Sequence, residues 1–286
     1  MLQLARCAAL AVAFLAGSGA CAAEPPVRHP NLLLNREDIE QVKQKIKDHD
    51  WAARLFERVR ALADDAGRTG RNPREAALVH VLTGERRYAQ AVRQAVVGHA
   101  RSQLPKYQTL DLRANPDFGA WGPLPTLAWA YDLTYDAFSD EERQLVEHYL
   151  RTACRSIIAG AKVRPNSQDL MFGKHFEVGV VGYCLGDKEL IDWALHDPGA
   201  HGPSSGGFYP ALDTNIHDRY FWGEAPRYAL GRTLQGMLAL AEAASWSTRS
   251  SSIPSRAGPS WRSRSAASWR SPTSATRTPA TPGSSA

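Results

Sequence analysis

Cysteine is scarce in this sequence, with four among 286 residues. Cys7 and Cys21 fall in a short apolar segment at the N-terminus, so only Cys154 and Cys184 remain for the folded protein. Both lie in apolar helical patterns, which favours buried free thiols, although an exported compartment would permit a disulfide. Their spacing matches no metal-binding pattern and no ligand cluster stands elsewhere, so we expect neither a metal nor another cofactor.

Long apolar runs are missing as well. Beyond the N-terminus no segment approaches the roughly 20 apolar residues of a membrane span, so we expect none. Residues 1–23 carry one positive charge at Arg6, an apolar run and then small residues, which is typical of a secretory signal peptide. We therefore expect a periplasmic or secreted protein, with lipid attachment at Cys21 as the weaker alternative.

Acidic residues and lysine are absent from residues 245–286, which hold six arginines, 14 serines and five prolines. Removing those arginines from the 34 basic residues leaves 28 against 29 acidic ones, so the net charge of +5 belongs to this tail and does not indicate nucleic-acid binding. Such a composition predicts disorder. Because it begins abruptly within a helical pattern, we interpret it as an out-of-frame segment that leaves the preceding domain, residues 24–244, incomplete.

Strand-like alternation is also lacking, whereas apolar residues at helical spacing recur throughout residues 24–244. The class is therefore all-α, built of consecutive antiparallel helices as an incomplete (α/α) toroid or a plain helical solenoid. No fixed-period repeat names a solenoid family. A loop with a short strand or helix is expected over 196–225. Helices are expected over 35–63, 72–82, 88–103, 121–137, 139–158, 168–185, 188–195 and 229–244.

An aromatic and acidic loop runs into the last of these helices. It reads FWGEAPRY over residues 221–228 and sets Tyr228 behind Pro226 at a helix entrance. An aromatic face can stack on a sugar, and a phenol can transfer a proton, so this loop suits a carbohydrate cleft. His175 lies 53 residues upstream of Tyr228 and forms the other half of the candidate site.

Four further stretches accompany this loop: HPNLLL at 29–34, WGP at 121–123 followed by AWAYD at 128–132, and GDKELIDWA at 186–194. In this order they resemble the toroid domain of alginate lyases and heparinase II/III-like polysaccharide lyases. The resemblance covers residues 29–244. It implies an acidic, uronate-containing polysaccharide or oligosaccharide as substrate and cleavage by β-elimination, in which the C5 proton is removed and the bond to the C4 oxygen breaks.

The resemblance also implies roles for particular residues. His175 would neutralise the substrate carboxylate or assist as base, and Tyr228 would transfer the proton. Lys174 stands where the family often has Asn, and Glu177 would orient His175 or contact sugar hydroxyls. The remaining expected substrate contacts are Asn166, His217, Trp222, Glu224 and Arg227.

Other interpretations stay open at this point. His175 could be a core-edge histidine and Tyr228 a buried tyrosine at a helix start. A toroid glycoside hydrolase needs two carboxylic acids, for which Asp213, Asp218 and Glu224 are candidates. A non-catalytic glycan-binding toroid is a third possibility. The resembling lyases add a residue from a following β-sandwich, which residues 245–286 cannot form. The sequence leaves the oligomeric state and the sugar open.

Overall fold

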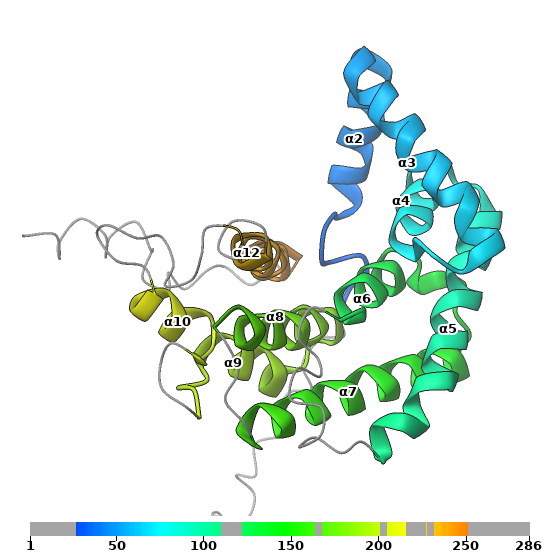
Figure 1. Ribbon diagram of the computed structural model, residues 1–286. Helices are drawn as coiled ribbons and strands as arrows, with labels where there is room; N and C mark the ends of the chain where they lie inside the picture. The colour runs from blue at the N-terminus through cyan, green and yellow to red at the C-terminus, as the bar shows by residue number, and fades with distance from the viewer. Residues whose placement is uncertain are drawn as a thin grey trace, which may run out of the picture. The chain divides into compact units, whose positions relative to one another are not determined.

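The computed structural model describes residues 27–109, 122–163, 168–200, 205–215, 227 and 232–250, and all regular structure in those ranges is helical (Figure 1). This confirms the all-α class. The chain divides into two units, residues 1–250 and 251–286, and the second lies outside the described ranges. Of the described helices, none combines the length and the apolar character needed to cross a bilayer.

The helices follow one another with short connections. Their bounds are α2 Arg36–Asp48, α3 Asp50–Thr69, α4 Pro73–Thr83, α5 Arg86–Gln108, α6 Leu124–Leu133, the 3₁₀ turn η1 Tyr135–Ala137, α7 Asp140–Val163, α8 Gln168–Leu185, α9 Lys188–His196, α10 Phe208–Asn215 and α12 Leu234–Ser250.

The single helix predicted over residues 35–63 is wrong, because the structure has two. Asn35 does begin α2: its side chain accepts the Asp38 N–H at 2.9 Å, and the Asp38 carboxylate accepts the Asn35 N–H at 3.1 Å. The break falls at His49, whose extended backbone (φ −132°, ψ 120°) ends α2 and begins α3. His49 is neither Gly nor Pro, so the sequence carries no local sign of this break.

Other predicted boundaries are confirmed only in part: α5 and α7 each continue five residues beyond their predicted ends at 103 and 158, and α6 spans Leu124–Leu133 rather than 121–137. Pro73 occupies the first turn of α4, and Gly84 ends it in the left-handed conformation with φ 77°. Ser139 and Glu142 form the expected capping box before α7. The expected loop at 196–225 contains the helix α10. At the other end α12 continues to Ser250, so residues 245–250 of the predicted disordered tail are helical.

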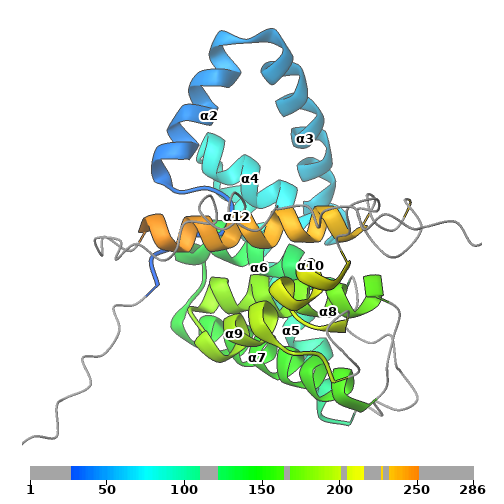
Figure 2. The same cartoon turned by 90° about the vertical axis from the view of Figure 1, so that its left-hand side faces the viewer.

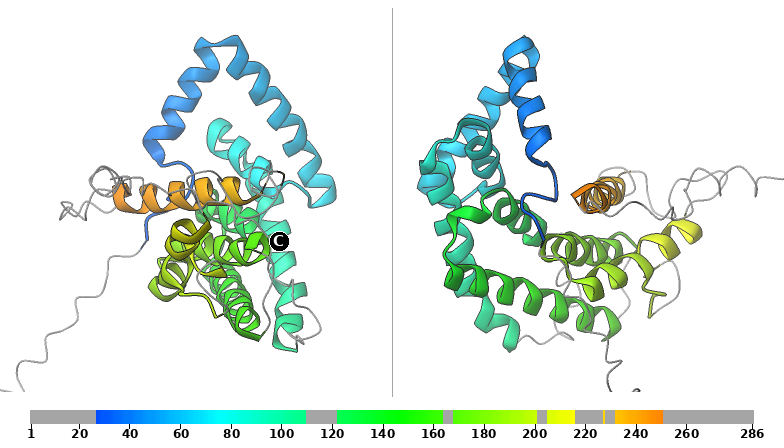
Figure 3. Two further views of the ribbon diagram at one scale, coloured as in Figure 1. Left: turned by 60° about the vertical axis from the view of Figure 1, so that its left-hand side comes forward. Right: turned by 180° about the vertical axis from the view of Figure 1, so that it is seen from behind.

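Eight of the described helices form two rows. Contacts run from α4 to α6, from α6 to α8 and from α8 to α12, and α3, α5, α7 and α9 pack on this row. In Figures 1 and 3, α8 lies between α7 and α12, and Figure 2 shows α12 from the side. The inner position explains the composition of α8, in which every residue from 172 to 184 is buried. A helix covered on all sides has no solvent-facing polar stripe, and the apolar residues of α8 are accordingly spread around the helix.

Hydrogen bonds to Asp132 hold the segment before α2 against the end of α6. Its carboxylate accepts the Asn31 N–H at 3.0 Å, the Leu32 N–H at 2.9 Å and the His29 Nδ1–H at 2.6 Å. The His29 ring also stacks on Tyr135, with centroids 4.0 Å apart. Two of the stretches quoted above, HPNLLL and AWAYD, are therefore joined in space by one buried carboxylate.

The cysteine expectation is confirmed. Cys154 and Cys184 are buried and free, and burial raises the pKa of both thiols well above the ordinary value. Both thiols therefore stay protonated at neutral pH.

Helix α8 approaches α9 closely at Gly182. A Cβ there would lie 2.9 Å from the backbone nitrogen of Ile191 and 3.0 Å from the Leu190 Cβ. We expect Gly182→Ala to destabilise the fold by about 1–3 kcal/mol through overpacking, despite the better helix propensity of Ala. Gly98→Ala, on α5 with nothing within 4 Å of the new Cβ, is the matched control and should be neutral or stabilising. Urea unfolding followed by circular dichroism measures both; equal effects would contradict the packing argument.

Candidate functional site

Helix α8 presents three of the predicted site residues. Lys174 and Glu177 are each 1% exposed and His175 is 0% exposed. Since α8 is an inner helix, these polar groups are held inside the protein rather than on its surface. Buried polar and ionisable groups are costly unless they are satisfied, so their contacts indicate what they do.

His175 is fixed by two groups from the region of α9. Its Nε2 lies 2.9 Å from Oδ2 of Asp197, the residue that follows α9. Its ring stacks on Trp193, with centroids 4.0 Å apart and planes 15° from parallel. Because an ionised carboxylate only accepts hydrogen bonds, the Nε2 atom carries a proton. An imidazole held in one orientation and tautomer by a carboxylate is the arrangement that acid–base catalysis uses.

Glu177 contacts a different part of the molecule. Its Oε2 accepts the Leu124 N–H at 3.2 Å, at the start of α6, and a Cβ on Gly122 would lie 3.3 Å from the same oxygen. Of the two roles considered for Glu177, orienting His175 is therefore performed by Asp197. The contact with α6 instead caps a helix N-terminus with a carboxyl group from a neighbouring helix.

Burial raises the pKa of Glu177 to about 8, while hydrogen bonds from the backbone N–H groups of Leu124 and Gly122 act in the opposite direction. Its Oε1 has no hydrogen-bond partner among the described residues. Tyr107 and Tyr149 lie near enough for the Glu177 charge to raise their pKa values further. At neutral pH the group is therefore mainly a neutral carboxylic acid.

The raised pKa makes stability depend on pH. Between the ordinary glutamate pKa, 4.5 here, and the folded value of about 8, the folded state holds a proton that the unfolded state has lost. Below pH 4.5 the contribution of Glu177 to the free energy of unfolding is fully present. As the pH rises from there toward 8, this contribution is lost at up to about 1.4 kcal/mol per pH unit.

We expect Glu177→Gln to flatten this part of the stability profile, because a neutral amide cannot ionise. Urea unfolding at several pH values from 5 to about 8.5 measures the slope. Glu189→Gln, at an exposed position on α9, is the control and should leave the profile unchanged. A wild-type stability that did not fall over this interval would contradict the assignment.

The remaining predicted residues are placed only in part. Arg227 is exposed. Asp213, a candidate acid for the hydrolase alternative, is exposed on α10. The residues that lie outside the described ranges are Asn166, His217, Asp218, Trp222, Glu224 and Tyr228. The predicted partnership of His175 with Tyr228 therefore stays a prediction.

Asp197 and Trp193 were not predicted as site residues. Trp193 stands in the GDKELIDWA stretch, and Asp197 follows it by four residues, about one helical turn. Both could have been found by pairing α8 with α9 as neighbouring helices and asking which carboxylate at the end of α9 faces a histidine on α8.

One group of possible metal ligands occurs among the described residues: His29, Asp132 and Cys184, whose ligand atoms lie within 4.8 Å of one another. Both Asp132 oxygens already accept hydrogen bonds, and the Cys184 thiol, which contacts the Ala128 carbonyl at 3.7 Å, holds its proton. Hydrogen bonding thus accounts for this cluster without an ion.

No protein-family model matches the chain, and no curated protein matches it.

Proposed function

We propose that the chain is a polysaccharide lyase of the alginate lyase and heparinase II/III-like kind, acting on a uronate-containing polysaccharide. The observation that carries the proposal is His175, fixed by Asp197 and Trp193 on an inner helix. It stands 53 residues before Tyr228, at the spacing that the resemblance implies.

The arrangement of helices supports the corresponding fold. In an (α/α) toroid, inner helices contact one another around a ring, and outer helices cover them. The structure has a matching arrangement of inner and outer helices. The inner row consists of α4, α6, α8 and α12, and the helices packed on it are α3, α5, α7 and α9. We propose that it forms part of such a ring, with the cleft on the side of the inner helices.

In the proposed reaction a base removes the C5 proton of the uronate. The electron pair forms the C4–C5 double bond, the bond to the C4 oxygen breaks, and that oxygen receives a proton. Tyr228 performs the proton transfer. His175 neutralises the carboxylate or assists as base, and Lys174, its neighbour in sequence, adds positive charge. The His175 ring is buried, so the reactive form must expose one ring edge to the substrate.

The test is the absorbance of the unsaturated product. Alginate, heparan sulfate and hyaluronan are incubated with the 286-residue chain and with a version whose downstream reading frame is restored. At least one polymer should yield unsaturated uronate, and His175→Ala should weaken both turnover and substrate binding. Absence of unsaturated product from both proteins across the panel would contradict the proposal.

We also propose that the protein is exported, as the pattern over residues 1–23 indicates. N-terminal sequencing of protein recovered from the periplasm or medium should begin near residue 24.

A further inference from the structure

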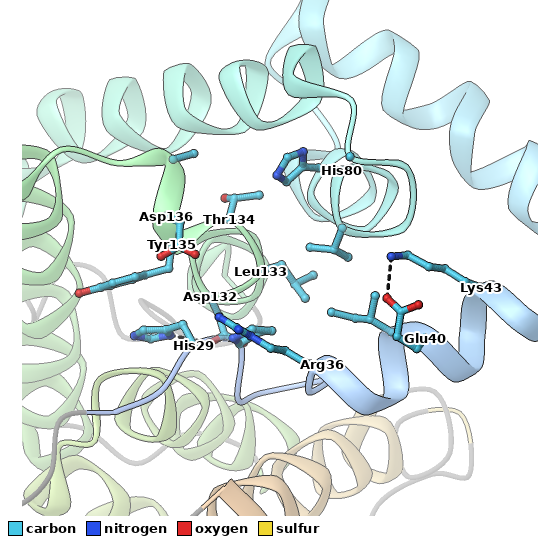
Figure 4. Close-up of a pocket in the computed structure, with 15 residues that line it drawn as sticks. His29, Arg36, Glu40, Lys43, His80, Asp132, Leu133, Thr134, Tyr135 and Asp136 are labelled. Carbon is cyan, nitrogen blue, oxygen red and sulfur yellow. Dashed lines mark hydrogen bonds and ion pairs between the residues drawn. The ribbon is translucent and has the colours of Figure 1, made fainter.

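A cavity of about 390 Å³ lies away from His175, between α2, the end of α4, the end of α6 and η1 (Figure 4). Small-molecule sites commonly have volumes of about 300–1,000 Å³. Ile39, Val81 and Leu133 give it an apolar floor, and polar side chains from all four elements surround this floor. The cavity thus has the size and the composition of a binding site for a small polar molecule.

Two histidines of the cavity offer hydrogen-bond acceptors. His29 Nδ1 donates to the Asp132 carboxylate at 2.6 Å, and His80 Nδ1 donates to the Glu85 carbonyl at 3.1 Å. A carbonyl or carboxylate oxygen can only accept, so the proton of each neutral ring is on Nδ1. The Nε2 atoms of both rings are then lone-pair acceptors, which suit the hydroxyl groups of a ligand.

Two cations, Arg36 and Lys43, and three carboxylates, Glu40, Asp132 and Asp136, line the cavity. The Lys43 ammonium pairs with Glu40 at 2.8 Å, as the dashed line in Figure 4 marks. Among the described residues, neither Arg36 on α2 nor Asp136 on η1 has an ion-pair partner. Arg36 extends from α2 toward Asp132 in the same view. Arg36 is exposed, and a guanidinium without an ion pair can bind a carboxylate through two parallel hydrogen bonds.

Stacking is not available at the aromatic residue of this cavity. One contact of the Tyr135 ring is the parallel His29 ring at 4.0 Å, and the Arg143 guanidinium lies 4.3 Å from its centroid. Planar aromatic ligands therefore gain little here, and the ligand must be held by hydrogen bonds and charge.

We propose that this cavity binds a small sugar acid, with its carboxylate on Arg36 and its hydroxyl groups on His80 and Asp136. The choice of a uronate among hydroxy acids rests on the proposed function, whereas the carboxylate and hydroxyl contacts rest on the cavity alone. The site would hold a free product or the end of an oligosaccharide at a place separate from the His175 region.

Isothermal titration calorimetry of the 286-residue chain with glucuronate tests this proposal. Glucose lacks the carboxylate, and glutamate carries carboxylates without hydroxyls, so both should bind at least about tenfold more weakly. Arg36→Gln should weaken glucuronate binding by about tenfold or more. Arg54→Gln, at an exposed position on α3, should leave it unchanged. No binding of glucuronate, or equal binding of glucose or glutamate, overturns the proposal.

The same titration with His175→Ala separates this inference from the proposed function. Retained glucuronate binding in His175→Ala, together with its loss in Arg36→Gln, supports the cavity even if no polymer is cleaved. If His175→Ala loses glucuronate binding and Arg36→Gln retains it, the ligand binds at α8. That result overturns the proposal that the cavity is the binding site.

Discussion

Replacing Tyr228 by phenylalanine is expected to lower the turnover of a uronate polysaccharide by about a hundredfold or more, the usual scale for a positioned acid or base. The substitution removes the hydroxyl and keeps the ring, so substrate binding should change little and the effect should appear in kcat rather than in KM. The rate of formation of unsaturated product by the 286-residue chain is the measurement.

Tyr209→Phe is the matched control, because Tyr209 is an exposed tyrosine on α10 that is 48% accessible. It should keep the wild-type rate. If Tyr228→Phe kept near-full activity while Glu224→Gln or Asp218→Asn abolished it, the β-elimination mechanism would be wrong. A glycoside hydrolase with two carboxylic acids would then replace it.

A second large effect is expected for Asp132→Ala, this time on stability. The substitution removes the acceptor of two buried backbone N–H groups and of the His29 ring. Leaving such donors unsatisfied in the interior should cost about 3–5 kcal/mol.

Chemical denaturation at pH 7 measures the loss. Asp140→Ala is the control: its carboxylate is 83% exposed and pairs with Arg143, so its removal should cost no more than about 1 kcal/mol. Asp132→Asn should fall between wild type and alanine, because the amide oxygen can still accept. A cost for Asp132→Ala no greater than that of the control would contradict an anchoring role.

Helix positions could be predicted well because apolar spacing and capping residues are local signals. The predicted bounds of α8 agree with the structure at both ends, and Pro73, Gly84 and Ser139 mark their boundaries as expected. The division at His49 could not be predicted, because the residue has no special backbone preference and the apolar pattern continues through it.

The candidate site was predictable only in part. Sequence spacing selected His175 and Glu177, but two residues apart on a helix they face different neighbours. Which neighbour each one meets depends on the packing of α9 and α6 against α8, and no local pattern encodes that packing. Two such tertiary contacts are those of Asp197 with His175 and of Leu124 with Glu177.

The burial of residues 172–184 of α8 affects synthesis on the ribosome. Its neighbours come from both sides in the chain: Leu124 precedes it, whereas Leu240 of α12 follows and would lie 2.6 Å from a Cβ on Gly179. Until residue 240 has left the exit tunnel, the side of α8 that packs on α12 stays exposed to solvent. The nascent chain up to α10 is therefore the stage at which chaperone binding matters most, and the first helices cannot complete a native core alone.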